Sequence, residues 1–514
     1  MKPGRALLSG GFEISPRAQW FLLGATVVLF LLATPAEPLF YGNQVTKYLI
    51  GMADANVGFL REDWVTNTRN GLPAFRGLVF LIYWLGLPQL SYVFWATLTG
   101  IFAVGTLGLA RSLQGQKTFA DCMRFDRSSF IFAAFFILTN IGLLTKLWWG
   151  VAQQHLLGPA LEPSHFATLF PLAILLYATE RRVAAFLCTI PIGLFHPGYI
   201  IPVAVLLAGF VIADRENLRR FGFSAWGALA LALIALAAHA LYLQIHFMST
   251  SPELAERANT ILTEKRIPEQ AMVSHWLFSW GSAARILAVL LAMWLARKHV
   301  IGRVLLVAFA GIVALTLLQV LTGNHLLALI APWRTSVWVV SLSVIVLLGA
   351  AAQFVDRQLE RPEFGPRMRL PVTGFLVVLA AVAALEGANA KFRDFGASRL
   401  AGYEIYLKSA ANAHTLYLVP TDLSNIRIDT LAPIYITGKS HPYQDYEVLE
   451  WYRRTQVADA LYKPAVIDCV ALENLARHER LTHMLVTRFD QTVSCSFARL
   501  VYLNAEARIY ALKL

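Results

Sequence analysis

The sequence predicts an α-helical polytopic membrane protein with about 11 transmembrane helices, followed by a small C-terminal α/β domain. Of its 514 residues, 57% are hydrophobic and only 15% are charged, whereas a soluble domain carries roughly 25% charged residues. The apolar residues also fall in runs close to the ~20 residues that cross a bilayer. The net charge of +12 lies mostly in short links between these runs, which is typical of membrane topology and argues against nucleic-acid binding.

Eleven apolar runs are predicted to span the membrane. They are 19–34, 89–110, 128–147, 165–179, 183–195, 199–213, 224–246, 282–296, 303–321, 335–354 and 371–387. Lys and Arg are concentrated in alternate links, namely 111–127, 180–182, 214–223, 297–302 and 355–370. Since cytoplasmic links carry the basic excess, the N-terminus is predicted to be cytoplasmic and the C-terminal domain to lie outside.

The chain divides into a membrane domain (1–389) and an outer domain (390–514). Short segments rich in β-branched and aromatic residues predict strands at 415–420, 433–437, 482–488, 499–504 and 508–514. The segment 445–462 has the spacing of an amphipathic helix. Cys469 and Cys495 both fall in the outer domain, where a disulfide would persist, and two free buried thiols are the open alternative.

The first outer loop (35–76) contains the first candidate site. Apolar residues recur at helical spacing through its charged segment 41–64, which predicts helices lying along the membrane surface. This segment ends at Glu62-Asp63-Trp64. A carboxylate there can act as a general base, so Asp63 is predicted to face a cavity roofed by the outer domain. The alternative is that Glu62 and Asp63 are solvated charges flanking an interfacial helix.

Arg334 is predicted to contact a lipid phosphate, because its planar guanidinium matches phosphate oxygens. Other polar residues predicted to bind substrate on the same face are Asn43, Gln44, His155, His165, His196, Asn324 and His325. For each histidine the alternative is a capped helix end or a local hydrogen bond. HxxxH and HExxH spacings are absent from the sequence, so no metal site is predicted.

The order of elements resembles the GT-C glycosyltransferases: one span, a long outer loop, a proline-led apolar piece and a span ending in basic residues. REDW (61–64) and GLPAF (71–75) match their first loop loosely. The resemblance implies a polyprenyl-phosphate-linked sugar donor, contact with membrane lipid, and Asp63 or Glu62 as the base. Asn43 and Gln44 stand where these enzymes carry an earlier acidic pair. The cofactor remains open, a divalent cation included.

The chain is also similar to an uncharacterised group of bacterial multi-span proteins. The residues that carry this likeness are NQ with Tyr48 (43–48), GFLREDWVTNT (58–68), HPGY (196–199), APWRTS (331–336) and KSHPYQDYEVLEWYRR (439–454). It implies a shared fold in a bacterial inner membrane. The last motif fits either acceptor recognition or a strand-to-helix turn whose Pro442 and Asp445 start a helix.

The predicted function is therefore transfer of a sugar from a polyprenyl-phosphate-linked donor to an extracytoplasmic glycan, lipid or protein. A non-catalytic membrane subunit of the same fold is the alternative, favoured by Asn43 and Gln44 in place of carboxylates. A lipid or polysaccharide transporter is disfavoured, because few charges fall inside the apolar runs.

Overall fold

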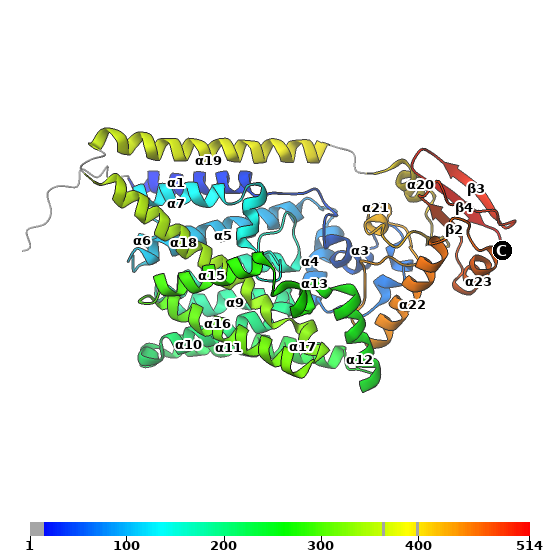
Figure 1. The fold of residues 1–514 in the computed structure, drawn as a ribbon, viewed down its shortest axis with the longest axis horizontal. Helices are drawn as coiled ribbons and strands as arrows, with labels where there is room; N and C mark the ends of the chain where they lie inside the picture. The colour runs from blue at the N-terminus through cyan, green and yellow to red at the C-terminus, as the bar shows by residue number, and fades with distance from the viewer. Residues whose placement is uncertain (1–14, 362–364, 397–399) are drawn as a thin grey trace, which may run out of the picture.

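The computed structural model describes residues 15–361, 365–396 and 400–514. A bundle of long helices is joined at one end to a smaller domain that contains a sheet (Figure 1). The principal bundle helices are α1 (Pro16–Ala33), α4 (Pro73–Trp84), α5 (Leu90–Leu113), α7 (Arg127–Leu138), α8 (Phe170–Ala178), α9 (Arg182–Phe195), α10 (Ile200–Ala213), α11 (Phe223–His246), α15 (Trp280–Leu295), α16 (Val300–Thr322), α18 (Ser336–Leu359) and α19 (Gly365–Gly396).

The predicted helical bundle is confirmed, but the count of about 11 transmembrane helices is not, and the run 128–147 is broken into α7 and the following η3 (Gly142–Trp148). By length and composition, six helical segments in the described residues are sufficient to cross a membrane. A seventh is added if α7 and η3, bent by 108°, form one broken span. Helices such as α9 and α10 have 14 residues each, which is short of the ~20 that a crossing needs.

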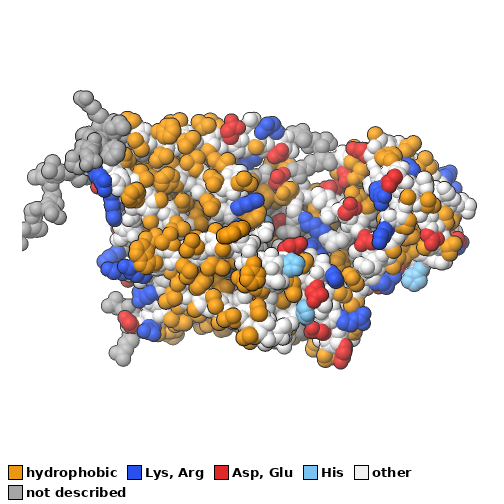
Figure 2. All heavy atoms as spheres, viewed as in Figure 1, with side chains coloured by type: hydrophobic (Ala, Val, Ile, Leu, Met, Phe, Trp, Pro, Cys, Tyr) orange, Lys and Arg blue, Asp and Glu red, His pale blue; other side chains and the backbone are white. Residues whose placement is uncertain are grey.

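The surface of the bundle exposes a large apolar area, whose contact with water would be unfavourable. Hydrophobic side chains cover its flank, while Lys and Arg gather at the end opposite the outer domain (Figure 2). Large aromatic side chains stand out from the surface, including Trp20 (65% exposed), Phe223 (95%) and Trp280 (92%). Apolar patches of this extent mark a surface in contact with something other than water, which fits a membrane protein.

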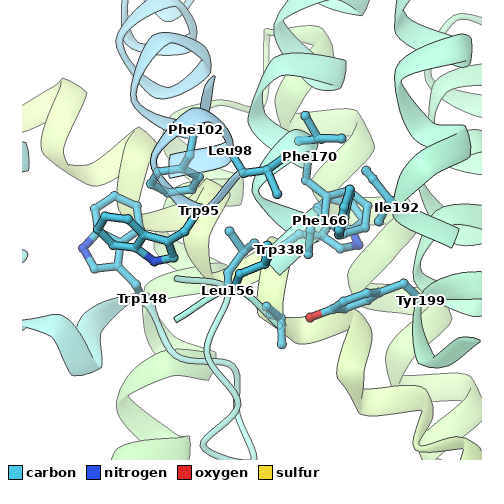
Figure 3. Close-up of a cluster of buried hydrophobic side chains, with 14 of the residues drawn as sticks. Trp95, Leu98, Phe102, Trp148, Leu156, Phe166, Phe170, Ile192, Tyr199 and Trp338 are labelled. Carbon is cyan, nitrogen blue, oxygen red and sulfur yellow. The ribbon is translucent and has the colours of Figure 1, made fainter. Parts of the chain in front are cut away.

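The bundle core is held together by aromatic rings. Phe30 of α1 stacks on Phe136 of α7 with ring centroids 4.2 Å apart. Figure 3 shows the neighbouring cluster, in which Phe170 lies between Trp338 at 5.6 Å and Tyr199 at 6.0 Å. The cluster therefore reaches from the middle of the bundle to the HPGY turn that contains Tyr199.

The outer domain is a mixed four-stranded sheet with helices. Its strands are β1 (Tyr417–Leu418), β2 (His483–Val486), β3 (Ala498–Leu503) and β4 (Arg508–Leu512), in the order β1-β2-β4-β3. β1 and β2 are parallel, and β4 is antiparallel to both β2 and β3. Its helices are α20 (Gly402–Ala410), α21 (Ile426–Thr430), α22 (Asp445–Tyr462) and α23 (Cys469–Glu479). The helix predicted at 445–462 is confirmed.

One predicted strand, 433–437, does not form. Ile434 makes only an isolated bridge to Tyr417. The bridge consists of the Tyr417 N–H donating to the Pro433 carbonyl and the Tyr435 N–H donating to the Tyr417 carbonyl. Pro433 faces β1 and has no N–H with which to extend the ladder. On the other side, the Ile434 N–H donates to the Asp63 carboxylate and its carbonyl accepts from Arg427, so no strand pairs there.

The outer domain is crosslinked by a disulfide between Cys469 and Cys495, which are 26 residues apart and have Cα atoms 5.3 Å from each other. Of the two alternatives for these cysteines, the bonded one is confirmed. The bond joins the start of α23 to the segment before β3. α19 continues to Gly396, past the predicted domain boundary at residue 389.

Candidate functional site

The first outer loop folds as predicted into short helices, α2 (Gln44–Lys47), α3 (Leu49–Asp54) and η1 (Leu60–Glu62). Its apolar residues, however, do not anchor it in an interface. Tyr48, Leu49 and Met52 are completely buried within the protein. The reason is α4, which folds against α3 so closely that a Cβ on Gly51 would lie 2.7 Å from the Cβ of Val79.

Asp63 is fully buried and fully engaged, rather than open to a cavity. Its Oδ2 accepts from Arg427 Nε at 2.6 Å and from the Ile434 N–H at 2.8 Å. Its Oδ1 accepts from the Val65 N–H at 2.8 Å. Both side chains of the Asp63–Arg427 pair are 0% exposed. The carboxylate therefore connects the first outer loop to the outer domain.

This placement corrects the expectation that Asp63 faces a cavity beside Arg334. None of the contacts of Asp63 reaches Arg334, and a carboxylate sealed in protein by a guanidinium cannot take a proton from a bound hydroxyl without breaking that pair. Glu62, the second predicted base, is exposed at the end of η1. Neither residue has the environment of a tuned catalytic base.

Arg334 lies in the turn η8 (Pro332–Thr335) at the outer-domain end of the bundle. Its guanidinium lies against the HPGY turn, where a Cβ on Gly198 would be 2.2 Å from Nη1 and 2.8 Å from Cε1 of His196. Only glycine leaves room for both side chains. Among the described residues Arg334 has no ion-pair partner, and its buried Nε has no hydrogen-bond partner.

Three more cations lie near Arg334, and we call Lys47, Arg266, Arg334 and Lys439 the basic cluster. Arg266 ends a π-helix, η7 (Ile261–Arg266), and donates to the Lys439 carbonyl at 2.9 Å. π-helical turns are rare and occur frequently at functional sites. Burial lowers the pKa of Arg266 and of Lys439, so both positive charges are held in partly desolvated positions.

Tyr443 connects the basic cluster to the outer domain. Lys47 Nζ donates to its hydroxyl at 2.8 Å, and the ring is 38% exposed. Burial alone would raise the pKa of Tyr443, but the positive charges of Lys47, Arg334 and Arg266 outweigh that effect and lower it. Three cations from separate segments therefore act on one phenolic oxygen, which shows that their fields converge there.

The cluster owes its charge to lysine and arginine and not to histidine. Burial, together with the charges of Arg266 and Lys47, holds the pKa of His441 well below its ordinary value, so this imidazole is neutral at pH 7. Four permanent cations thus share this face of the protein. Such a concentration of positive charge is repulsive unless an anion completes it, and lysine and arginine are common phosphate ligands.

Two carboxylates act on the basic cluster: Glu269 on Arg266 and Glu162 on Lys439. Glu162 is 6% exposed, and its charge acts on both Lys439 and Tyr199. Its two oxygens accept from the Asn43 backbone N–H at 2.8 Å and the Asn43 side-chain amide at 3.0 Å. The Glu162 carboxylate therefore lies directly beside Asn43, whose own side chain is an amide.

The remaining predicted site residues have local structural roles. Gln44 is buried and donates to the Leu161 carbonyl at 3.0 Å, and His165 bonds Thr99 at 2.9 Å inside the bundle. Asn324 caps the short helix α17 (His325–Ile330), and His325 bonds Thr263 at 3.0 Å.

His155 and His196 complete the set. His155 forms an isolated bridge with Trp149. His196 accepts the Gly198 N–H at 3.0 Å and is the predicted histidine that lies beside Arg334. Across the described residues, no group of three His, Cys, Asp or Glu side chains is arranged to hold a metal ion.

The residues that the sequence analysis did not single out are Lys47, Glu162, Arg266, Lys439 and Tyr443. Lys439 and Tyr443 do lie in the KSHPYQ segment, whose high polarity was the available signal. Of the two alternatives for that motif, the helix start is confirmed, because α22 begins at Asp445; acceptor recognition stays a prediction. Tyr443, which precedes the helix, bonds Lys47 of the basic cluster.

Comparison with known proteins gives little functional information. A family model described as a domain of unknown function (DUF6798) matches residues 406–458. This segment contains Arg427 of the buried ion pair as well as Lys439, His441 and Tyr443. No curated protein matches the chain.

Asp63→Ala is expected to destabilise the outer domain by ~3–5 kcal/mol, because it leaves Arg427 buried without a counter-charge. The matched control is Glu62→Ala, which removes an exposed carboxylate next in sequence and should change stability by less than ~0.5 kcal/mol. Thermal unfolding of the purified protein in detergent, with trypsin cleavage of the outer domain as a second readout, measures both. Equal stability of the two variants would contradict the structural role of Asp63.

Proposed function

We propose that the protein is a membrane glycosyltransferase that moves a sugar from a polyprenyl-phosphate-linked donor to an extracytoplasmic acceptor. The observation that carries the proposal is Arg334, a half-buried side chain whose Nε is sealed from solvent and which has no carboxylate partner among the described residues. Lys47, Arg266 and Lys439 add to its field. A phosphate attached to a lipid supplies the missing negative charge, and the apolar flank of the bundle supplies a surface for the lipid chain.

In this reaction the bond between the sugar C1 and the phosphate oxygen breaks, and a bond from C1 to the acceptor oxygen forms. The electron pair of the broken bond stays on the lipid phosphate, where Arg334 and its neighbouring cations stabilise it. The acceptor hydroxyl must lose its proton. We assign this step to Glu162 in place of Asp63, because the Glu162 oxygens are bonded only to neutral donors and its charge acts on Lys439 of the basic cluster.

A non-catalytic subunit that binds the lipid phosphate is the second candidate. It is favoured by the structural use of Asp63 and by the amides Asn43 and Gln44 where GT-C enzymes have carboxylates. The two candidates share the basic cluster and differ in whether Glu162 acts as a base, so separate experiments on Arg334 and Glu162 distinguish them.

The proposed location is a bacterial inner membrane, with the N-terminus in the cytoplasm and the outer domain outside. Two observations support this orientation. Lys and Arg gather at the bundle end opposite the outer domain (Figure 2), as expected of cytoplasmic links. The outer domain contains the Cys469–Cys495 disulfide, which would persist in an oxidising compartment.

Arg334→Gln is expected to weaken binding of a long-chain polyprenyl monophosphate by ~10–100-fold, the effect of losing charge-assisted hydrogen bonds. Arg334→Lys should be intermediate, since an ammonium lacks the planar fork. Native mass spectrometry of the protein in lipid nanodiscs measures the bound fraction. Arg357→Gln, at the other end of α18, removes the same charge and should leave binding unchanged. Equal binding by Arg334→Gln and Arg357→Gln would overturn the proposal.

Glu162→Gln is expected to retain lipid-phosphate binding while sugar transfer falls by ~10²–10⁴-fold, the usual cost of removing a positioned base. The amide keeps the size of the side chain and one hydrogen-bond acceptor for Asn43. Transfer from a radiolabelled polyprenyl-phosphate sugar to cell-envelope glycan measures the rate. If the wild type transfers no sugar from any donor tested, the non-catalytic subunit is favoured; full activity in Glu162→Gln excludes this residue as the base.

The orientation is tested with reporter fusions. Alkaline phosphatase fused after residue 400 should be active, because that enzyme folds only outside the cytoplasm, and a fluorescent protein that requires the cytoplasm should remain dark there. Fusions in the link 297–302 should give the opposite pattern. A cytoplasmic reporter signal at residue 400 would place the basic cluster on the wrong side for an extracytoplasmic acceptor.

A further inference from the structure

A second polar site lies in the outer domain, apart from the basic cluster. It is a cleft of about 240 Å³ just beyond the carboxyl ends of the parallel strands β1 and β2. Ligands of open α/β sheets bind characteristically at this edge, because the loops that follow parallel strands diverge there. Its polar lining consists of Thr421, Asp422, Asp459, Lys463, Thr487 and Arg488.

The walls of this cleft are fixed by buried hydrogen bonds. The Tyr462 hydroxyl lies 3.0 Å from the Leu418 carbonyl of β1 and 2.7 Å from the Leu485 carbonyl of β2. The side-chain amide of Gln491 donates to the Tyr462 and Pro464 carbonyls at 3.0 and 2.9 Å. The end of α22 is thereby tied to both strands. The cleft is therefore formed before a ligand binds, and binding does not cost the conformational entropy of ordering its walls.

The charges of the cleft balance, which separates it from the basic cluster. Asp422 and Asp459 oppose Lys463 and Arg488, so neither a phosphate nor a cation is selected. Some of the polar groups of the cleft already have partners within the protein: Thr421 donates to Asp459, and Arg488 pairs with Asp490. Within the described chain, the Asp422 carboxylate and the Lys463 ammonium have no hydrogen-bond or ion-pair partner.

The cleft lining offers both hydrogen-bond donors and acceptors, and its lining charges sum to zero. Such a lining matches a neutral polyhydroxylated ligand, because each sugar hydroxyl both donates and accepts hydrogen bonds. The volume agrees with a small ligand. Drug-sized ligands occupy sites of ~300–1,000 Å³, so a cleft of about 240 Å³ suits a single sugar ring.

We propose that this cleft binds one neutral sugar residue of a glycan. The cleft and the basic cluster meet in one short segment: the Gly438 N–H donates to the Thr421 carbonyl at 2.8 Å, and Lys439 of the basic cluster follows directly in the chain. Thr421 of the cleft and Lys439 of the basic cluster therefore lie on two segments that are joined by a direct hydrogen bond. That this glycan is the acceptor rests on the proposed transferase function; that the cleft binds sugar does not.

The test uses the full-length protein in nanodiscs and saturation-transfer NMR with methyl α-glucopyranoside, methyl α-mannopyranoside, methyl α-galactopyranoside and methyl α-rhamnopyranoside, each alone. At least one glycoside should receive saturation. Asp422→Ala and Asp459→Ala should each weaken its binding by ~10-fold or more, the effect of losing a hydrogen bond to a charged group. The control Glu473→Ala removes an exposed carboxylate of α23 in the same domain and should leave binding unchanged.

Three outcomes would overturn the proposal: no glycoside is saturated, binding survives in both aspartate variants, or inorganic phosphate displaces the glycoside. Arg334→Gln should leave glycoside binding intact. If Arg334→Gln also leaves polyprenyl-phosphate binding intact while the aspartate variants lose the glycoside, the transferase proposal fails and the sugar site stands. Unchanged thermal midpoints in the aspartate variants show that the loss comes from the cleft and not from unfolding.

Discussion

The buried ion pair between Asp63 and Arg427 fixes the outer domain on the bundle. Moving two charges out of water costs several kcal/mol per ion, and a buried pair recovers this only when its remaining hydrogen bonds are satisfied. Here they are: Arg427 also donates to the Thr437 hydroxyl at 3.0 Å and the Ile434 carbonyl at 3.1 Å, and Asp63 accepts from two backbone N–H groups, Val65 and Ile434. The loop and the domain can dock in only one register.

That register determines the composition of the basic cluster. Lys47 comes from the first outer loop, Arg266 from the π-helical turn, Arg334 from the bundle and Lys439 from the outer domain. Repulsion among the four cations lowers the free energy of unfolding of the protein, and such a cost is typical of a functional site. The Tyr443 hydroxyl accepts a hydrogen bond from Lys47 at 2.8 Å. A bound anion such as a phosphate would offset the repulsion.

The carboxylate of this site comes from an unexpected loop. GT-C-like chains are expected to carry it in the first outer loop, where this sequence has Asn43. In the structure Asn43 instead holds Glu162 through its backbone and side-chain amides, and Gly42, at φ +61°, allows the close approach because a Cβ there would lie 2.9 Å from the Glu162 oxygen. In the proposed transferase, Glu162 would take the role that the resemblance assigns to carboxylates of the first outer loop.

The sequence by itself determined the elements whose signal is local. Apolar runs fixed the bundle helices, alternation and β-branching fixed four of the five predicted strands, and Asp445 after Pro442 marked the start of α22. Tertiary structure decided what depends on long-range pairing. Asp63 and Arg427 are 364 residues apart, and no local pattern distinguishes a buried aspartate from a catalytic one. The Ile434 N–H and carbonyl bond that ion pair on the side facing away from β1, which no local pattern predicts. Glu162 lies beside the first outer loop because Asn43, 119 residues away, folds against it.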